Sequence, residues 1–138
     1  MFMKIQMSTD YAIRILQYLH MNPGDIHTAM TIAQAVGVTY PLFIKIANRL
    51  KRGGLLAAVQ GRNGGYQLGR LAEEISLYDV ILCVEGEIQF NHCLGDENHQ
   101  CDRGTLGECK LRSVLNDLRQ QVIKGMGEQS IADVTTCA

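Results

Sequence analysis

Apolar residues recur every three or four positions along several stretches of the chain, and this spacing predicts amphipathic helices. A first helix is expected over residues 9–21. Its core-facing residues are Ala12, Ile13, Leu16 and Leu19. A short second helix is expected to begin at Thr28 or Thr31 and to end at Gly37, because glycine readily adopts the left-handed conformation that closes many helices.

The tight turn at residues 37–38 leads into a third predicted helix. Thr39 can cap this helix by accepting a backbone hydrogen bond, and Pro41 in the first turn sacrifices no hydrogen bond. Gly53 and Gly54 are expected to end it. A short helix, a tight turn and a second helix form the helix-turn-helix pattern, whose second helix normally lies in the major groove of DNA.

Strand-forming residues at 57–60 and 66–68 flank the sequence Arg62-Asn63-Gly64-Gly65. Asn-Gly between two such runs predicts a β-hairpin with a type I′ turn, which needs positive φ at both central residues. The tip then presents Arg62 with little bulk around it, so it can enter a narrow groove. A helix-turn-helix followed by a glycine-tipped basic hairpin is typical of a winged helix-turn-helix protein.

The second half of the chain predicts a fourth helix over residues 76–84, a long polar loop over residues 85–105 and a long amphipathic helix over residues 106–126. The apolar stripe of the long helix consists of Leu111, Val114, Leu115, Leu118, Val122 and Met126. Little else in so short a chain is free to cover this stripe, so we expect two copies to pair through it as a homodimer. Residues 130–134 are expected to add one last turn.

The predicted fold is therefore mainly α-helical with a small β-hairpin wing, and a long C-terminal dimerisation helix follows the winged helix-turn-helix. We expect a DNA-binding domain at residues 1–84, a cysteine-bearing loop at residues 85–105, and the dimerisation helix with the C-terminal tail at residues 106–138. A two-fold dimer would place two DNA-reading units on a palindromic operator of double-stranded DNA.

Charge is distributed unevenly along the chain. Between residues 26 and 72 there is no Asp or Glu, whereas the same stretch contains six cations. They are Lys45, Arg49, Lys51, Arg52, Arg62 and Arg70. Because the whole chain has a net charge of −1, the residues outside this stretch carry −7. Such a basic block within an otherwise acidic protein indicates a polyanionic partner, since solubility alone favours interspersed charges of both signs.

The candidate DNA contacts lie on the third helix and on the hairpin. The residues expected at base edges are Thr39, Tyr40, Phe43 and Lys45. Those expected at phosphates are Arg49, Lys51 and Arg52. For Tyr40 and Phe43 the alternative role is packing in the core. Arg62 and Asn63 at the hairpin tip complete the set.

Cys93, Cys101 and Cys109 form a regularly spaced triad, C-x7-C-x7-C, in or just after the polar loop. The odd total of five cysteines favours metal ligands or redox groups over a disulfide framework. Zinc with His92 or His99 as fourth ligand is one interpretation, although structural zinc sites usually contain ligand pairs two to four residues apart. An iron–sulfur cluster on a pliable loop is another, and the spacing alone does not separate the two.

Several functional classes are disfavoured by the sequence. No apolar run approaches the roughly 20 residues of a membrane span, and the N-terminus lacks the apolar region and cleavage site of a signal peptide. We therefore expect a cytoplasmic protein without a membrane partner. There is no recognisable Ser/His/Asp set, phosphate-cradling loop or pair of carboxylates in a plausible site, so we expect neither an enzyme nor a small-molecule substrate.

The winged helix, the wing sequence GRNGGYQL, the three loop cysteines, the long helix and the closing SIADV together resemble the IscR/NsrR family of bacterial transcription regulators, the Rrf-type repressors. The resemblance covers nearly the whole chain, and the wing motif and the cysteine triad are its specific parts. It implies a dimeric DNA-binding repressor with a cysteine-ligated iron–sulfur cluster, 4Fe–4S or 2Fe–2S. The signal would be iron–sulfur supply, nitric oxide or redox state.

The resemblance also implies roles for individual residues. The three residues that match the family's thiolate ligands are Cys93, Cys101 and Cys109. Arg62 matches the wing arginine that enters the minor groove. In IscR-type members the fourth ligand is a histidine three residues after the third cysteine, where this chain has Arg112. In the nitric-oxide-sensing type it is an N-terminal aspartate of the partner subunit, which makes Asp10 the leading candidate, with a helix-start carboxylate as its alternative role.

Two other interpretations of the triad remain open. One is a metal-free repressor that senses thiol or redox state, and the other is a DNA-binding regulator stabilised by zinc. Family members that lack the cysteines sense through protein partners, and the triad argues against that branch.

Overall fold

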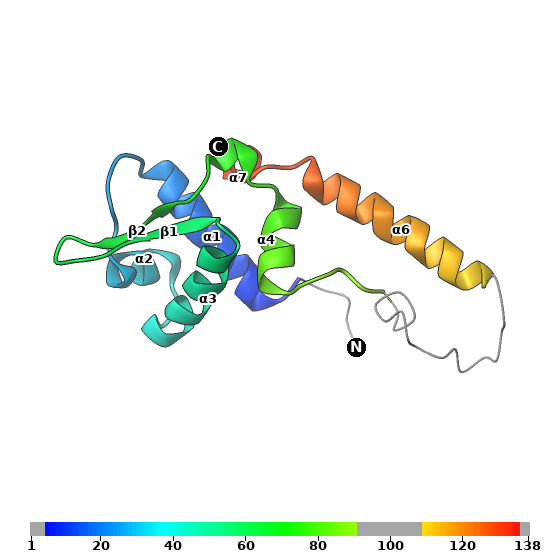
Figure 1. The fold of residues 1–138 in the computed structure, drawn as a ribbon, viewed down its shortest axis with the longest axis horizontal. Coiled ribbons are helices and arrows are strands. Elements are labelled where there is room, and N and C mark those ends of the chain that lie inside the picture. Colours follow the sequence, from blue (N-terminus) through cyan, green and yellow to red (C-terminus); the bar gives the residue numbers. More distant parts are fainter. Residues whose placement is uncertain (1–4, 91–108, 136–138) are drawn as a thin grey trace.

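The structure is a computed structural model that describes residues 5–90 and 109–135. Helices make up most of these residues, and a two-stranded antiparallel hairpin separates α3 from α4 (Figure 1). The elements are α1 (Met7–Met21), α2 (Ala29–Val36), α3 (Tyr40–Arg52), β1 (Leu56–Val59), β2 (Gly65–Leu68), η1 (Ala72–Glu74), α4 (Leu77–Val84), α6 (Lys110–Gly127) and α7 (Ile131–Thr135). The mainly α-helical fold with a hairpin wing and a long C-terminal helix is confirmed. The predicted start of that helix, at residues 106–108, lies outside the described residues.

The helix-turn-helix forms through the local signals that predict it. Thr28 Oγ1 accepts a hydrogen bond from the backbone N–H of Thr31 (3.2 Å) and so caps α2. Gly37 takes φ 77°, a left-handed conformation, at the end of α2. Thr39 Oγ1 then accepts a bond from the N–H of Leu42 (3.4 Å) at the start of α3.

The first turn of α1 is held by a residue far away in sequence. α1 begins at Met7, two residues before the predicted start, and no side chain next to it in sequence caps it. Instead, Thr9 Oγ1 donates to Glu85 Oε2 (2.7 Å) and the N–H of Gln6 donates to Glu85 Oε1 (3.3 Å). Thr9 is fully buried, and Glu85 directly follows α4. The carboxylate of Glu85 therefore joins the start of α1 to the end of α4.

The hairpin reverses direction differently from the prediction. Val59 pairs with Gly65, which leaves residues 60–64 as the loop. Gly61 has the positive φ of this loop (107°), whereas neither Asn63 nor Gly64 has one, so the predicted type I′ turn at Asn63-Gly64 is wrong. The N–H of Gly64 donates to the carbonyl of Gly61 (3.0 Å), which places residues 62 and 63 at the centre of the turn. The loop is longer than a two-residue hairpin turn. Gly61, directly before the turn, adopts the positive φ with which the chain reverses direction.

The core lies around α1, which packs against α2, α3, α4 and α7. Its largest fully buried residues are Phe43, Ile15, Leu16, Ile32, Ile46, Leu50, Ile75, Ile131 and Val80. On α1 the structure adds Ile15 and the polar Thr9 to the predicted core face, while Ile13 is half-buried. The expected last turn is confirmed by α7. Its first residue, Ile131, is buried in the core, and α7 packs next to α1 and η1.

The long helix α6 contains no buried residue and extends away from the other helices (Figure 1). Of its predicted stripe, Leu111, Val114 and Leu118 are 42%, 46% and 45% exposed. Arg119 attaches α6 to the segment after α4, because its guanidinium contacts the Glu87 carboxylate at 3.0 Å. Part of the stripe is thus open to solvent within the part of the chain that the structure describes.

Across residues 5–90 and 109–135, no single helix combines the length and apolar character needed to cross a membrane. Taken together, α2 and α3 reach that length and composition, but they meet at a bend of 106°.

We predict that Phe43→Ala lowers the free energy of unfolding by about 3–5 kcal/mol, because it removes a fully buried ring from the core. Urea unfolding followed by circular dichroism measures this. Tyr40→Ala, on the same helix but 48% exposed, is the control and should change stability by less than about 1 kcal/mol. Equal losses for the two variants would contradict the packing described above.

Candidate nucleic-acid interface

The N-terminal half of α3 presents three of the predicted base contacts to solvent. Thr39, Tyr40 and Lys45 are exposed. Phe43 is 0% exposed, so packing in the core, the alternative considered for it, is the role it has. The exposed side chains that can meet a base edge are therefore two hydroxyl-bearing residues, one of which also caps α3, and one lysine.

The predicted phosphate contacts on the second half of α3 have two different environments. Lys51 and Arg52 are exposed at the end of the helix, and neither side chain makes a hydrogen bond or ion pair with another described residue. Arg49 is half-buried, and its Nη1 donates to the backbone carbonyl of Val84 at 2.8 Å. Two of the three cations are thus free for phosphate, and the third is bound within the protein.

The hairpin carries the remaining predicted contacts. Arg62 and Asn63 are exposed at the centre of its turn, and Figure 1 shows this loop projecting beyond the helices. We call β1, β2 and residues 60–64 the wing. Its two free side chains, one cationic and one amide, lie at the point of the molecule that can reach furthest into a groove.

The wing is fixed to the helix-turn-helix at Tyr66. The N–H of Tyr66 donates to the carbonyl of His27 (2.7 Å), and the N–H of His27 donates to the carbonyl of Tyr66 (3.1 Å). The ring of Tyr66 also packs edge-to-face on Phe43 of α3, with 5.3 Å between ring centroids. Backbone bonds and an aromatic contact thus join α3, β2 and the residue before Thr28 into one unit.

His27 is the residue of this unit that sequence reasoning missed. Its ring lies between Tyr18 Oη, 3.4 Å from Nδ1, and the carbonyl of Asn22, 3.1 Å from Nε2. A single bridging residue has no alternating pattern of polar and apolar neighbours, so periodicity cannot identify it.

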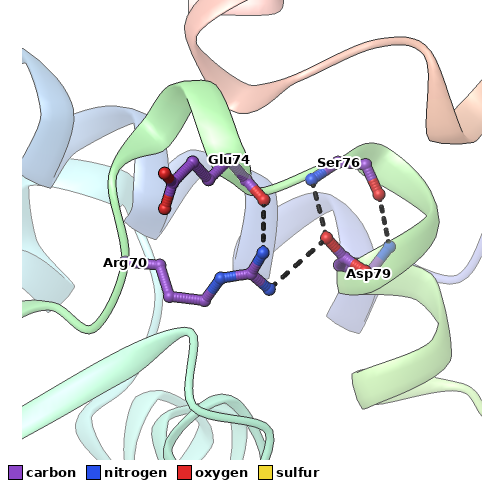
Figure 2. A network of polar contacts seen from close by, with 4 residues as sticks. All are labelled: Arg70, Glu74, Ser76 and Asp79. Atoms are coloured by element: carbon purple, nitrogen blue, oxygen red, sulfur yellow. Dashed lines mark hydrogen bonds and ion pairs between the residues drawn. The ribbon is translucent and has the colours of Figure 1, made fainter.

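A second network holds the base of the wing (Figure 2). Arg70 donates to the backbone carbonyl of Glu74 (2.7 Å) and lies 3.7 Å from a carboxylate oxygen of Asp79. Asp79 also accepts a hydrogen bond from the N–H of Ser76, and Ser76 Oγ accepts one from the N–H of Asp79, both at 3.0 Å. Arg70 therefore helps to hold the wing in place. Asp79, which lies outside the basic block, partly offsets its positive charge.

Burial affects the protonation of two groups next to this surface. It raises the pKa of Tyr66, and the nearby Tyr40 adds to that effect, so Tyr66 stays neutral. Burial also raises the pKa of the Cys83 thiol, whose Sγ donates to the carbonyl of Arg49 (2.9 Å). Because metal ligation needs a thiolate, Cys83 is poorly suited to hold a metal.

The structure describes two of the four predicted cluster ligands. Cys109 is half-buried and directly precedes α6. Asp10 lies on α1 and forms an ion pair with Arg14 at 2.8 Å, one helical turn away. Cys93 and Cys101 lie outside the described residues. Within residues 5–90 and 109–135, no three His, Cys, Asp or Glu side chains come together as a metal site.

The fold and its exposed cations define a winged helix-turn-helix protein. A family model described as "Rrf2: Iron-dependent Transcriptional regulator" matches residues 5–136. The chain belongs to this Rrf2 family and is a transcriptional regulator, not an enzyme.

Several relatives are similar to this chain in sequence, and several solved structures are similar to it in fold. The chain is 27% identical over 135 residues to the transcriptional regulator NsrR of Halalkalibacterium halodurans, covering 97% of this chain and 91% of that protein. It is 35% identical over 113 residues to protein aau3 of Rhizobium meliloti, covering 82% and 72%. Its fold is similar to that of CymR, the global cysteine regulator of B. subtilis, with a TM-score of 0.75, 21% identity and 98% of each chain covered. T. potens IscR has a TM-score of 0.71 at 21% identity, covering 96% of this chain and 85% of that one.

We predict that Gly65→Ala destabilises the protein by more than about 2 kcal/mol, because an added Cβ would lie 2.3 Å from the backbone carbonyl oxygen of His27. The contact is with backbone, so the bridge between His27 and Tyr66 would have to open. Urea unfolding measures the change. Gly125→Ala on α6 is the control, since its Cβ meets nothing within 4 Å of the described residues and should stabilise by up to about 1 kcal/mol. A Gly65→Ala protein as stable as wild type would contradict the close approach.

Proposed function

We propose that this Rrf2-family regulator is a cytoplasmic repressor that binds a palindromic operator as a homodimer. The observation that carries this proposal is the surface shared by α3 and the wing, where exposed cations and hydrogen-bonding side chains lie on a rigid unit. Thr39, Tyr40 and Lys45 would contact base edges in the major groove. The residues proposed to contact phosphates are Lys51 and Arg52.

The wing would enter the adjacent minor groove. Arg62 and Asn63 lie at its tip, and an arginine is attracted to the strong negative potential of a narrow, A·T-rich minor groove. Both side chains are exposed, and the wing is braced at both ends of β2. A braced wing loses little conformational freedom on binding, which favours affinity.

The homodimer is supported by the open stripe of α6. Leu111, Val114 and Leu118 are each more than two-fifths exposed, and they recur at helical spacing. A second α6, related by a two-fold axis, presents the same stripe and would remove these side chains from water. The two α3 helices of such a dimer would then read the two halves of a palindrome.

The regulatory input is proposed to be an iron–sulfur cluster held by Cys93, Cys101 and Cys109. Three thiolates suit iron–sulfur chemistry, and the description of the family as iron-dependent supports the same choice. Asp10 of the partner subunit is the proposed fourth ligand; its carboxylate is 46% exposed and so is accessible. When bound, the cluster would supply a group sensitive to nitric oxide, oxidants or iron–sulfur supply, and its nuclearity is 4Fe–4S or 2Fe–2S.

A metal-free thiol sensor is the second candidate. The observation that favours it is the fold likeness to CymR, whose structures include the global cysteine regulator of B. subtilis and an oxidised form from Staphylococcus aureus. In this version two of the three cysteines would form a disulfide when an oxidant removes two electrons and two protons from their thiols. Mass spectrometry of the oxidised protein distinguishes the two, because the thiol-sensor version predicts a disulfide within the triad, whereas the cluster version keeps the three cysteines as ligands.

We predict that anaerobic reconstitution with iron and sulfide gives a coloured protein, and that serine at position 93, 101 or 109 removes most of the visible absorption, since each variant loses a thiolate ligand. Cys83→Ala is the matched control and should keep the colour, because the Cys83 thiol donates to the carbonyl of Arg49 and burial raises its pKa. A colourless wild-type protein that binds one equivalent of zinc would support the zinc alternative instead.

In the same assay, Asp10→Ala should make the cluster more labile to chelators and nitric oxide than Asp25→Ala, an exposed aspartate in the turn after α1. Unchanged lability would leave Asp10 with its observed role in the ion pair with Arg14.

For DNA, we predict that Arg62→Ala weakens binding most at operators with an A·T-rich minor groove beside each half-site. Fluorescence anisotropy with duplexes that differ only in these flanking positions measures the preference. Arg52→Ala is the control, since a phosphate contact should weaken binding to all sequences alike. A uniform loss for Arg62→Ala would make Arg62 a phosphate contact as well.

A further inference from the structure

The end of α4 is joined to α3 by two hydrogen bonds that run in opposite directions. Arg49 Nη1 donates to the backbone carbonyl of Val84 (2.8 Å), and Cys83 Sγ donates to the backbone carbonyl of Arg49 (2.9 Å). One residue of α3 is therefore bound through both its side chain and its backbone to two consecutive residues of α4. α3 and α4 also pack directly against each other.

The bond from Arg49 is electrostatically favourable where it lies. Val84 is the last residue of α4, and the last carbonyls of a helix have no partner within the helix. These carbonyls carry the negative end of the helix dipole, which a cation stabilises. Arg49 thus acts as a C-terminal cap of α4 supplied by another helix. Turning its guanidinium toward a phosphate would leave the part-buried carbonyl of Val84 without this donor.

The space between α3 and α4 is also narrow at Cys83. A Cβ added at Gly53, the residue after α3, would lie 2.5 Å from Cys83 Sγ and 3.5 Å from Cys83 Cβ. Gly53 has φ −80°, so its backbone does not require glycine. The space next to Gly53 is therefore filled by the Cys83 thiol, and a side chain added at position 53 would press against α4.

Two other helices, α1 and α6, also contact the end of α4, where the Arg49 hydrogen bond is accepted. Glu85, directly after Val84, accepts hydrogen bonds from Gln6 and Thr9 at the start of α1. Glu87 lies 3.0 Å from Arg119 of α6. Figure 1 shows the start of α1 and the end of α4 next to each other. The end of α4 is therefore a fixed reference against which α3 is held.

We propose that Arg49 is a positioning residue for DNA recognition: it fixes α3 against the end of α4 and thereby sets the sequence discrimination of Thr39, Tyr40 and Lys45. This inference rests on the proposed function, because it takes α3 as the helix that reads base edges. It replaces the expectation, drawn from sequence, that Arg49 contacts a phosphate. The difference between the two roles is measurable, since a phosphate contact contributes to salt dependence and a positioning residue contributes to discrimination.

The test compares Arg49→Gln with Arg52→Gln in the full-length protein. A duplex selected by the wild-type protein from a randomised library is the specific probe, and a scrambled duplex of the same length is the non-specific one. Dissociation constants for both duplexes are measured from about 50 to about 200 mM salt. Over this range the loss of phosphate contacts dominates the change in affinity. Arg52→Gln should weaken binding to both duplexes and lower the magnitude of the salt slope by about 1.8, or about 0.9 for each subunit of the dimer.

For Arg49→Gln, we expect the ratio of specific to non-specific affinity to fall about tenfold or more, comparable to the loss of one base contact, with the salt slope unchanged. A fall in slope like that of Arg52→Gln, with the ratio preserved, would overturn the proposal and make Arg49 a phosphate contact. An unchanged ratio and slope would also overturn it. A wild-type protein that does not prefer any selected duplex would instead overturn the proposed function itself.

A second pair of variants tests the same contact without changing charge. Gly53→Ala should force α3 and Cys83 apart and lower the affinity ratio, again with an unchanged salt slope. Adding Cys83→Ala removes the sulfur atom and leaves the ordinary 3.5 Å contact, but it also removes the hydrogen bond to Arg49. The double variant should therefore recover the ratio of Cys83→Ala alone. This pair decides the question if Arg49→Gln does not fold. A Gly53→Ala protein with wild-type discrimination would overturn the proposal.

Discussion

The DNA-reading unit depends on the contact of one tyrosine with two elements. Tyr66 exchanges backbone hydrogen bonds with His27 and packs its ring on Phe43. The wing also contacts α3 through β1 and α1 through β2, and the Tyr66 contact adds a direct link from β2 to Phe43 of α3. With it, a groove-reading helix and a groove-entering tip move as one body. Their relative position must match the spacing of neighbouring major and minor grooves, and a rigid connection sets that spacing before DNA is bound.

The end of α4 also fixes the position of α3. The segment from Cys83 to Glu87 contacts α3, α1 and α6 within five residues. The chain then continues to residue 90, close in sequence to the first loop cysteine, Cys93. A ligand state of the cysteines that shifts this segment would reach the DNA-reading helix directly, because its partners there are Arg49 and Gly53. In the proposed mechanism, recognition and regulation thus share one short segment.

The parts of the fold that depend on local chemistry could be predicted from sequence. Thr28, Gly37 and Thr39 cap or end their helices as expected, because the relevant hydrogen bonds are made within three or four residues. The hairpin was located correctly, but its turn type was not. Strand register decides that type, and the Asn63-Gly64 pair does not determine register by itself.

The long-range features could not be predicted in this way. Glu85 holds the start of α1 from 76 residues away, and no pattern near Thr9 indicates this. Arg49 has the same charge as Arg52 and lies three residues from it, yet one is bound inside the protein and the other is free within the described residues. Periodicity and charge identify which residues can contact DNA, whereas tertiary contacts decide which of them are available to do so.

The most direct test of the account is footprinting of the wild-type protein on a selected duplex with two chemical probes. Dimethyl sulfate reports on guanine N7 in the major groove, and hydroxyl radicals report on the sugar edges that line the minor groove. We expect protection in the major groove of each half-site, from α3, together with protection in the flanking minor groove, from Arg62. Protection in one groove alone, or none that depends on sequence, would contradict a reading unit made of α3 and the wing.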